Sequence, residues 1–462
     1  MSNGRYRAYP EYKFTGAEWL TSVPASWAMF EGKRIFESCR EISHASDEQL
    51  AASQRFGVVP QSLMMELNDA KVMLALKGTS SFRHVEKNDY VISLRSFEGG
   101  IEYSAYTGCV SPAYTVLRPR RPIAPGFYKH LFKSRPYISA LQATTDSLRD
   151  GKAISYEQFG TIPLMLPPLP EQTQIAAFLD HETAKIDRLI EKQEELIRLL
   201  KEKRQAVISH AVTKGLNPHA PLKDSGIEWL GQVPSHWVVL QFKFLIRSID
   251  QGKSPECEGR LASPEEWGVL KSGCVNRGVF LQEEHKALPA KIAPTLAAEV
   301  KEGDLLMSRA SGSTDLIGSV GLVGKVRSRL MMSDKIFRIH PESGVLPKFI
   351  WRMAASIPVR KQIELSINGA AGLANNLTKE SIGRLWIARP PLAEQEAITD
   401  YLESRCARFD FLISNAEHQV TLLQERRTAL ISAAVTGKID VRHWQPPAGS
   451  ETGTPPDRGA FA

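Results

Sequence analysis

The chain has 462 residues, 42% of them hydrophobic and 24% charged, with a net charge of +7 and a pI near 9.0. This composition is typical of a folded globular protein, and the length predicts more than one domain. No apolar run approaches the roughly 18 residues of a membrane span, and Met1–Arg5 lacks the apolar core of a signal peptide. Five widely spaced cysteines without a Cys-x-x-Cys pair favour free thiols over disulfides or a zinc site, so we expect a cytoplasmic protein.

The first distinctive segment is a tryptophan-containing motif that the chain contains twice. Glu-Trp-Leu, a Val-Pro pair and a second tryptophan occupy residues 18–27 and, 210 positions later, residues 228–237. Stacking on DNA bases is one possible role of these tryptophans. Two domains that bind different DNA sequences are not expected to share the residues that contact the bases. The equal spacing therefore favours a second role, in which each tryptophan anchors its domain against that domain's own core. The four residues concerned are Trp19, Trp27, Trp229 and Trp237.

Each tryptophan motif is followed by a region that repeats poorly. Residues 28–167 and 238–390 share only scattered landmarks, such as Asp89 with Asp304 and Phe127 with Phe349. We therefore predict two mixed α/β domains, at residues 1–167, including the N-terminal anchor segment, and at residues 216–390. The first region carries 17 basic and 14 acidic residues, for +3, and the second carries 22 and 15, for +7. The positive excess lies in these two regions, as expected if they contact phosphate.

A long helix is predicted between the two domains, at residues 168–215. It opens with Pro-Leu-Pro-Glu-Gln, contains no later proline and ends at Gly215, as expected at a helix C-terminus. Apolar residues recur at steps of 3, 4 and 7, as in the a/d seam of a coiled coil. The predicted seam positions are Ile175, Leu179, Ile186, Leu189, Leu196, Leu200 and Val207.

A second helix of the same length and frame is predicted at residues 391–442, at an offset of 223. It opens with Pro-Leu-Ala-Glu-Gln, and Gly437 follows its apolar pattern. The matching seam positions are Ile398, Leu402, Phe409, Leu412, Gln419, Leu423 and Leu430. About 40 residues at ~1.5 Å each predict a rod of ~60 Å, and we expect the two helices to pair antiparallel. Residues 443–462 are rich in Pro, Gly, Ser and Thr and are predicted to be disordered.

The combination of these motifs resembles the specificity subunit of type I restriction-modification systems, over about residues 10–442. The resemblance implies an α+β fold with two target-recognition domains separated by two long antiparallel coiled-coil helices in an internal pseudo-two-fold repeat. It also implies that each domain reads one half of a bipartite site in double-stranded DNA. Partners would be two methyltransferase (modification) subunits, together with restriction/translocase subunits. This chain would bind no cofactor itself, and S-adenosylmethionine and ATP are expected on the partner subunits.

The base-reading residues are expected among polar positions that the two domains do not share. Arginine and lysine suit guanine or phosphate, and an amide suits adenine. In the first domain these are Lys77, Thr79, Ser80, Arg83, Arg95, Arg120 and Arg121, with Arg118, Lys129, Lys133 and Arg135 as further phosphate contacts. In the second domain they are Lys253, Arg309, Ser313, Lys325, Arg327, Arg329, Asn375 and Asn376. For any one of these residues, a solvated loop is the simpler interpretation.

Subunit docking and spacing are expected along the two helices. The residues predicted for that role are Glu171, Gln172, Leu179, Leu189, Leu200, Glu394, Gln395, Leu402, Leu412 and Leu423.

No segment of the sequence matches a catalytic motif. The segment Asn217-Pro218-His219 fails the Asn/Asp-Pro-Pro-aromatic pattern of adenine methyltransferases, and residues 318–324 are glycine-rich without the Gly-x-Gly-x-x-Gly pattern. No Walker-type ATP site occurs, and the 11 histidines show no metal-ligand spacing. The chain is therefore predicted to be a non-enzymatic DNA-reading subunit. The alternatives are a coiled-coil scaffold that bridges two proteins without reading DNA and, less favoured, an enzyme fused to its own recognition domains.

Overall fold

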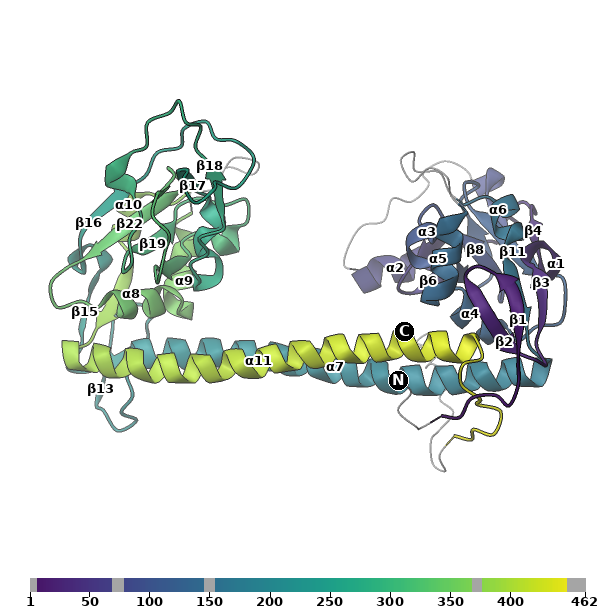
Figure 1. The fold of residues 1–462 in the computed structure, drawn as a ribbon. Helices are drawn as coiled ribbons and strands as arrows, with labels where there is room; N and C mark the ends of the chain where they lie inside the picture. The colour runs from purple at the N-terminus through teal and green to yellow at the C-terminus, as the bar shows by residue number, and fades with distance from the viewer. Residues whose placement is uncertain (1–5, 69–78, 145–153, 368–375, 447–462) are drawn as a thin grey trace. The chain divides into compact units, whose positions relative to one another are not determined.

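The computed structural model describes residues 6–68, 79–144, 154–367 and 376–446. The chain forms two compact units, one made of residues 1–193 with 418–462 and the other of residues 194–417. Helices and strands are mixed in both units, which confirms the predicted α+β class (Figure 1). Among the described residues, no helix has the length and apolar character needed to cross a membrane.

The first unit is built on a four-stranded antiparallel sheet in the order β4-β11-β8-β9. Its strands are β4 (Phe36–Cys39), β11 (Thr115–Pro119), β8 (Tyr90–Ile92) and β9 (Glu102–Tyr103). Helices α4 (Pro125–Leu131) and α5 (Arg135–Ala143) contribute aromatic side chains to the core beneath it. Phe36 lies at the centre of that core, with its ring centroid 5.1 Å from Tyr128 and 5.5 Å from Phe132.

Four two-stranded ladders complete the strands of the first unit. These are β1 (Tyr12–Ala17) with β2 (Leu20–Pro24), β3 (Ala28–Glu31) with β12 (Pro163–Leu166), β5 (Leu50–Ser53) with β6 (Gly57–Pro60), and β7 (Arg83–Val85) with β10 (Gly108–Val110). Its short helices are α1 (Gly32–Ile35), α2 (Gln61–Asn68), η1 (Thr79–Ser81), α3 (Ser96–Gly99) and α6 (Tyr156–Thr161).

The second unit repeats this plan with different connections. Its four-stranded sheet has the order β16-β22-β19-β20, formed by β16 (Ile246–Gln251), β22 (Ile336–Pro341), β19 (Leu305–Ser308) and β20 (Val320–Leu322). Helices α8 (Pro347–Ala354) and α9 (Ile357–Leu365) correspond to α4 and α5, and in all four a proline occupies one of the first two positions, where its fixed φ favours helix initiation. The landmarks Asp89 and Asp304 directly precede the equivalent strands β8 and β19.

The ladders at the entry and exit of the second unit also match those of the first. They are β13 (Leu222–Asp224) with β14 (Gln232–Pro234), and β15 (Val238–Gln241) with β23 (Trp386–Arg389). The units differ most in a three-stranded sheet of β18 (His285–Ala287), β17 (Gly268–Leu270) and β21 (Leu330–Met331), where β17 and β21 run parallel. The remaining short helices are η2 (Phe242–Phe244), η3 (Ser272–Gly278), η4 (Leu296–Ala298), η5 (Thr314–Leu316) and α10 (Lys379–Gly383).

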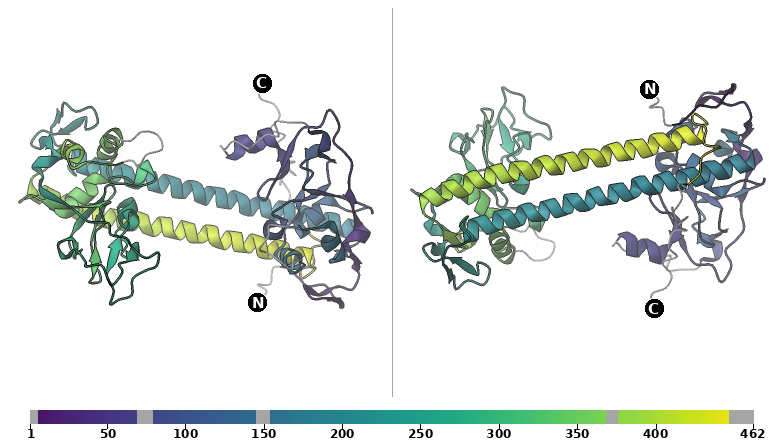
Figure 2. Two further views of the ribbon diagram at one scale, coloured as in Figure 1. Left: turned by 90° about the horizontal axis from the view of Figure 1, so that it is seen from above. Right: turned by 90° about the horizontal axis from the view of Figure 1, so that it is seen from below.

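Two long helices, α7 (Leu169–Lys214) and α11 (Leu392–Val435), contribute one part of their length to each unit. In the first unit Asp187 forms an ion pair with Arg427, at 2.7 Å. In the second, Lys201 pairs with Glu417 at 3.4 Å and Arg204 with Asp410 at 3.2 Å. The partner number falls as the α7 number rises, so the helices run antiparallel, as predicted (Figure 2). Gly215 and Gly437 follow the helices with φ of +75° and +71°, a conformation that favours glycine.

The predicted a/d seam is correct near the helix ends and wrong in the middle. Leu189, Leu196 and Leu412 are 40–47% exposed, and Gln419, predicted as the polar seam residue, is also exposed. The neighbouring positions Ile413 and Ala416 are buried instead. The helices carry more leucines than one face can bury. The apolar periodicity therefore fitted two adjacent stripes of the helix surface and did not show which of them is buried.

The C-terminal segment is ordered further than predicted. Trp444, inside the stretch predicted to be disordered, packs edge-on against Phe178 with ring centroids 5.4 Å apart. Residues 447–462 lie outside the described residues.

Candidate nucleic-acid interface

The repeated motifs of the first unit meet in a first joint, formed by Trp27, Glu171 and Gly437. The indole N–H of Trp27 donates to Glu171 Oε1 at 2.8 Å, and the Tyr9 hydroxyl donates to the same oxygen at 2.6 Å. Trp27 is fully buried. A Cβ at Gly437 would lie 2.3 Å from Pro24 Cδ and 3.1 Å from the Trp27 ring, so the end of α11 closes on the start of α7 only with glycine there.

The second unit contains an equivalent second joint, formed by Trp237, Glu394 and Gly215. Trp237 is fully buried and donates to Glu394 Oε2 at 2.9 Å, while His236 lies 2.6 Å from Glu394 Oε1. A Cβ at Gly215 would lie 3.2 Å from the Trp237 ring. The anchoring role predicted for Trp27 and Trp237 is therefore confirmed.

The outer pair of tryptophans does not behave alike. Trp19 is half-buried against Tyr137, whereas Trp229 is 39% exposed. The anchor interpretation therefore holds for Trp19 and not for Trp229.

The glutamine of each Pro-Leu-x-Glu-Gln motif fixes the domain to its helix. Gln172 Oε1 accepts from the backbone N–H of Ala124 at 2.9 Å, and its amide donates to Pro167 O at 2.8 Å. Gln395 repeats both bonds, with Leu346 N at 3.0 Å and Pro390 O at 3.0 Å.

These contacts give part of the predicted docking and spacer set a structural position within the domains. Glu171, Gln172 and Gln395 are buried in the joints, and Leu179 and Leu402 are fully buried in the domain cores. They position the helices and present no surface to a partner. Glu394, Leu189 and Leu412 are partly exposed, and Leu200 and Leu423 are half-buried.

The residues predicted to read DNA in the first domain are dispersed. Lys77 lies outside the described residues, Thr79 and Ser80 form η1, and Arg83 lies on β7 with Nε 3.3 Å from Pro112 O. Arg95 and Arg120 are exposed and pair with Glu98 and Glu37, at 3.1 and 3.2 Å. Arg121 is exposed and lies over the Phe30 ring, at 4.4 Å.

Three cations predicted to contact phosphate are held by carboxylates of the first unit. Arg118 forms ion pairs with Glu41, Glu86 and Asp89, the last at 2.9 Å. Lys133 is 2.6 Å from the buried Glu102, and burial raises the pKa of Glu102 to about 7 against the opposing effect of Lys133. Lys129 is 3.2 Å from Asp180. Arg118, Lys129 and Lys133 therefore each have a carboxylate partner within the first unit, which sequence alone did not reveal. Arg135 opens α5.

The second domain brings several of its predicted residues together at one edge of the β16-β22-β19 sheet. The loop after β16 contains Lys253, and the loop after β19 contains Arg309 and Ser313. Asp334, just before β22, joins them: its backbone oxygen accepts from Gln251 at 3.0 Å and Arg309 at 3.4 Å. Its carboxylate accepts from Ser254. Sequence reasoning missed Asp334, which is the organising residue of this edge.

The charge state of Asp334 fits that role. Burial by itself raises its pKa, but the hydrogen bonds from Ser254 and Lys335 outweigh it and hold the pKa of this carboxyl below its usual value. Asn376 joins the same edge through a β-bridge with Ala310, and Asn375 lies outside the described residues. The exposed Lys253, the half-buried Arg309 and the exposed Ser313 line this edge.

The three basic side chains at residues 325–329 lie in different environments. Lys325 is exposed, whereas Arg327 donates to Ala262 O at 3.1 Å and Pro264 O at 3.4 Å. Arg329 has φ of +62° and pairs with Glu265 at 3.0 Å. Arg327 and Arg329 therefore fasten their own loop, which leaves Lys325 available to a ligand.

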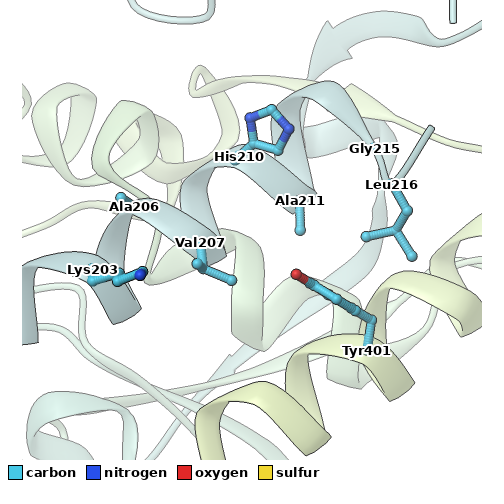
Figure 3. Close-up of a pocket in the computed structure, with 8 residues that line it drawn as sticks. All are labelled: Lys203, Ala206, Val207, His210, Ala211, Gly215, Leu216 and Tyr401. Carbon is cyan, nitrogen blue, oxygen red and sulfur yellow. The ribbon is translucent and has the colours of Figure 1, made fainter. Parts of the chain in front are cut away.

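A cavity of 450 Å³ lies in the second unit beside the last turns of α7 (Figure 3). Figure 3 shows the Tyr401 side chain extending from α11 toward Ala211 and Leu216. The offset of 223 relates Tyr401 to Phe178, whose ring is contacted by Tyr6 and Trp444, at centroid distances of 5.3 and 5.4 Å. Tyr6 and Trp444 therefore cover Phe178 in the first unit, whereas an open cavity lies beside Tyr401 in the second.

The fold and the repeated joints define a class of protein in which two unlike domains are mounted on a duplicated helical frame. The type I restriction modification DNA specificity domain family matches residues 26–198. The specificity subunit of the type I restriction enzyme EcoKI from Escherichia coli K12 is 26% identical over 334 residues, which cover 70% of this chain and 68% of that subunit. The EcoEI specificity subunit of Escherichia coli is 31% identical over 215 residues, or 46% of this chain and 36% of that subunit.

The architecture agrees with these sequence matches. A chain from a structural study of complex assembly and conformational transition of the type I R-M system superposes with a TM-score of 0.68. The two share 16% identity, and the superposition covers 90% of this chain and 99% of that one. The chain is therefore similar to the specificity subunits of type I restriction-modification systems, and its residues 26–198 match their DNA specificity domain.

Proposed function

We propose that the chain reads a bipartite DNA target, with residues 28–167 reading one half-site and residues 238–390 the other. This proposal rests on the contrast between the two joints, which are alike, and the loops of the two domains, which differ. The tryptophan–glutamate hydrogen bond is the same in both joints, from Trp27 to Glu171 and from Trp237 to Glu394. The loops that follow the equivalent strands β4 and β16 share neither sequence nor contacts.

The edge around Asp334 is the reading surface proposed for the second half-site. Lysine and arginine supply contacts to guanine or phosphate, and Asn376 carries an amide of the kind that binds adenine. In the first domain the corresponding candidates are Ser80 in η1, Arg83 at the start of β7, and Arg95 in the loop after β8, the strand equivalent to β19.

Exchange of one domain tests this division. Residues 238–390 would be replaced by the same region of a related specificity subunit, and the modified DNA motif would be read by methylation-sensitive sequencing. We expect the half-site of the second domain to change and the other half to persist. The reciprocal exchange of residues 28–167 is the matched control, and a change in both halves, or in neither, contradicts the proposal.

Recruitment of modification subunits is proposed for the long helices. In the second unit, helix α7 carries an apolar stripe of Leu196 and Leu199, 44% and 47% exposed, and Phe411 of α11 is 64% exposed. Such an apolar stripe is typical of a surface covered by another protein. The open cavity beside Tyr401 offers a further apolar site for that partner. We expect S-adenosylmethionine and ATP to bind to the modification and restriction subunits and not to this chain.

Charge substitution on the stripe tests the recruitment. The double variant Leu196→Glu with Leu199→Glu is expected to retain DNA binding and lose co-purification with the methyltransferase subunit. Leu296→Glu, at a leucine of η4 that is 69% exposed, is the control for a surface charge change. Undiminished co-purification of the double variant would contradict the assignment. A scaffold that does not read DNA, the alternative function, predicts no shifted species with a degenerate DNA library.

A further inference from the structure

Two histidines and a glutamate gather in the first unit, at the edge of the sheet where β4 ends. Glu41 and His44 lie in the loop that follows β4, and His84 lies on β7. One ligand atom from each of the three lies within 4.8 Å of the others. The spacing in the sequence concealed this cluster, because 40 positions separate His44 from His84.

The backbone brings the three residues together by a short ladder. His84 N donates to Glu41 O at 2.9 Å, and Ser43 N donates to Phe82 O at 2.9 Å. The two imidazole rings stack at 4.2 Å between centroids, with an angle of 28° between their planes. His44 Nε2 is 3.2 Å from Glu41 Oε1. Small side-chain rotations therefore suffice to direct all three groups at one point.

Asp47 contacts two residues of the cluster, His44 and His84, and fixes their orientation. Its Oδ2 accepts from the backbone N–H of His44 at 2.8 Å and lies 2.8 Å from His84 Nδ1, with both side chains about 95% buried. A proton on Nδ1, held by Asp47, leaves the lone pair on Nε2. A carboxylate behind the histidine is the outer-shell arrangement that fixes the tautomer of metal-binding histidines.

The surrounding charge favours a cation. Arg118 forms an ion pair with Glu41, at 3.3 Å, and it is already shared with Glu86 and Asp89. Three carboxylates, those of Glu41, Glu86 and Asp89, therefore share one arginine. The half-buried thiol of Cys39, the last residue of β4, lies 3.9 Å from Glu41 Oε2.

We propose that Glu41, His44 and His84 bind one Zn²⁺ ion, with the Cys39 thiolate as fourth ligand and Asp47 as the outer-shell partner of His84. Two imidazoles, a carboxylate and a thiolate are ligands that Zn²⁺ takes in tetrahedral sites. His44 is 54% exposed and gives the ion a path from solvent. The bound ion would tie the loop after β4 to β7, the strand that carries Arg83.

Metal binding is tested on the full chain after removal of bound metal by a chelator. Titration with Zn²⁺ is expected to show one ion per chain and a raised unfolding temperature. Replacement of Zn²⁺ by Co²⁺ is expected to give the thiolate-to-cobalt charge-transfer absorption, which Cys39→Ser abolishes and Cys257→Ser retains. The variants His44→Ala and Glu41→Gln, both at partly exposed positions, should lose stoichiometric binding while folding normally.

A graded variant and a matched control complete the test. Asp47→Asn is expected to weaken Zn²⁺ binding by about 10- to 100-fold, as for other outer-shell partners. His340 and Asp250 form a similar histidine–carboxylate pair, at 2.8 Å, outside the cluster, so His340→Ala should leave the stoichiometry at one. The proposal is overturned if the metal-free chain takes up no Zn²⁺, or if His44→Ala and Glu41→Gln bind it as the unaltered chain does.

Discussion

Glu171 and Glu394 each accept a hydrogen bond from the repeated tryptophan at the first turn of a long helix. An ionised carboxylate at this place also interacts favourably with the positive end of the helix dipole. Burial, followed by the hydrogen bond to Glu171, raises the pKa of the Tyr9 phenol, so Tyr9 remains a donor. Two buried donors therefore depend on one carboxylate in the first joint.

Removing this acceptor should affect the two joints unequally. Glu171→Ala leaves the Trp27 indole and the Tyr9 hydroxyl without a partner, and we expect the free energy of unfolding to fall by about 3 kcal/mol. Glu394 is 39% exposed, so water takes its place as hydrogen-bond acceptor in the variant. Glu394→Ala should therefore lower the free energy of unfolding by only about 1 kcal/mol. Urea denaturation measures both. Glu171→Gln, which keeps an oxygen acceptor, is the control, and equal losses at the two joints would refute this account.

The cluster at residues 325–329 contains one available cation and two that the fold uses. Substitution of Lys325 and Lys253 by alanine should weaken binding to all DNA sequences and lower the slope of log K against log salt by about 0.9 for each lost phosphate contact. Arg327→Ala should instead reduce stability, by about 2 kcal/mol, because it removes the bonds to Ala262 O and Pro264 O. DNA titrations at several salt concentrations, with thermal unfolding alongside, separate the two effects. An unchanged slope for the lysine variant would place both lysines away from phosphate.

At the scale of elements, the long helices bury one stripe and expose another. The buried stripe includes Ile413 and Ala416, and the exposed one includes Phe411 and Leu412. The ion pairs Lys201–Glu417 and Arg204–Asp410 flank the buried stripe in the second unit. Exposed pairs of this kind contribute little, so the apolar contacts carry most of the helix pairing.

Adjacent substitutions on α11 test this register. Ile413→Ala should lower the free energy of unfolding by about 2 kcal/mol, because it removes a side chain that is 8% exposed. Leu412→Ala, at a position that is 40% exposed, should cost about 0.5 kcal/mol. Thermal unfolding of the two variants compares them directly. A larger loss at Leu412 would restore the seam predicted from the sequence.

At the scale of the whole molecule, the proposed bipartite reading raises the question of what sets the distance between half-sites. The two helices contain 46 and 44 residues, and at ~1.5 Å of rise each approaches ~70 Å. We propose that their length sets the spacer between the two half-sites, since both run from one unit into the other.

Lengthening both helices by one heptad tests this proposal. Lys201 pairs with Glu417, so seven residues inserted after Leu200 must be matched by seven after Ala416 to keep the antiparallel register. The added rise of ~10 Å corresponds to about three base pairs at ~3.4 Å. Sequencing of the methylated motif should show unchanged half-sites with a longer spacer. Insertion in one helix alone is the control and should impair activity, whereas full activity at the parental spacing would show that the helices do not set it.

Local patterns in the sequence were sufficient for the duplicated plan. Equal spacing of Trp27 and Trp237, the two Pro-Leu-x-Glu-Gln segments, and the closing Gly215 and Gly437 determined the long helices and the anchoring role of both tryptophans, whereas the α+β class was implied by the family resemblance. They did so because anchors, helix starts and helix ends depend on residues that are close in the chain or repeated at a constant offset.

Only the tertiary structure decided which side chains are available and which are already used. Arg118, Lys133 and Arg327 look like phosphate contacts in the sequence, but acids and carbonyl oxygens from distant segments hold them. His84 joins Glu41 and His44 only because β7 pairs with the loop after β4. The helix seam is a further example. Ile413 and Leu412 are equally apolar, and only the structure shows that Ile413 is buried and Leu412 exposed. Partners such as these are set by chain topology, which brings together residues whose separation in the sequence carries no signal.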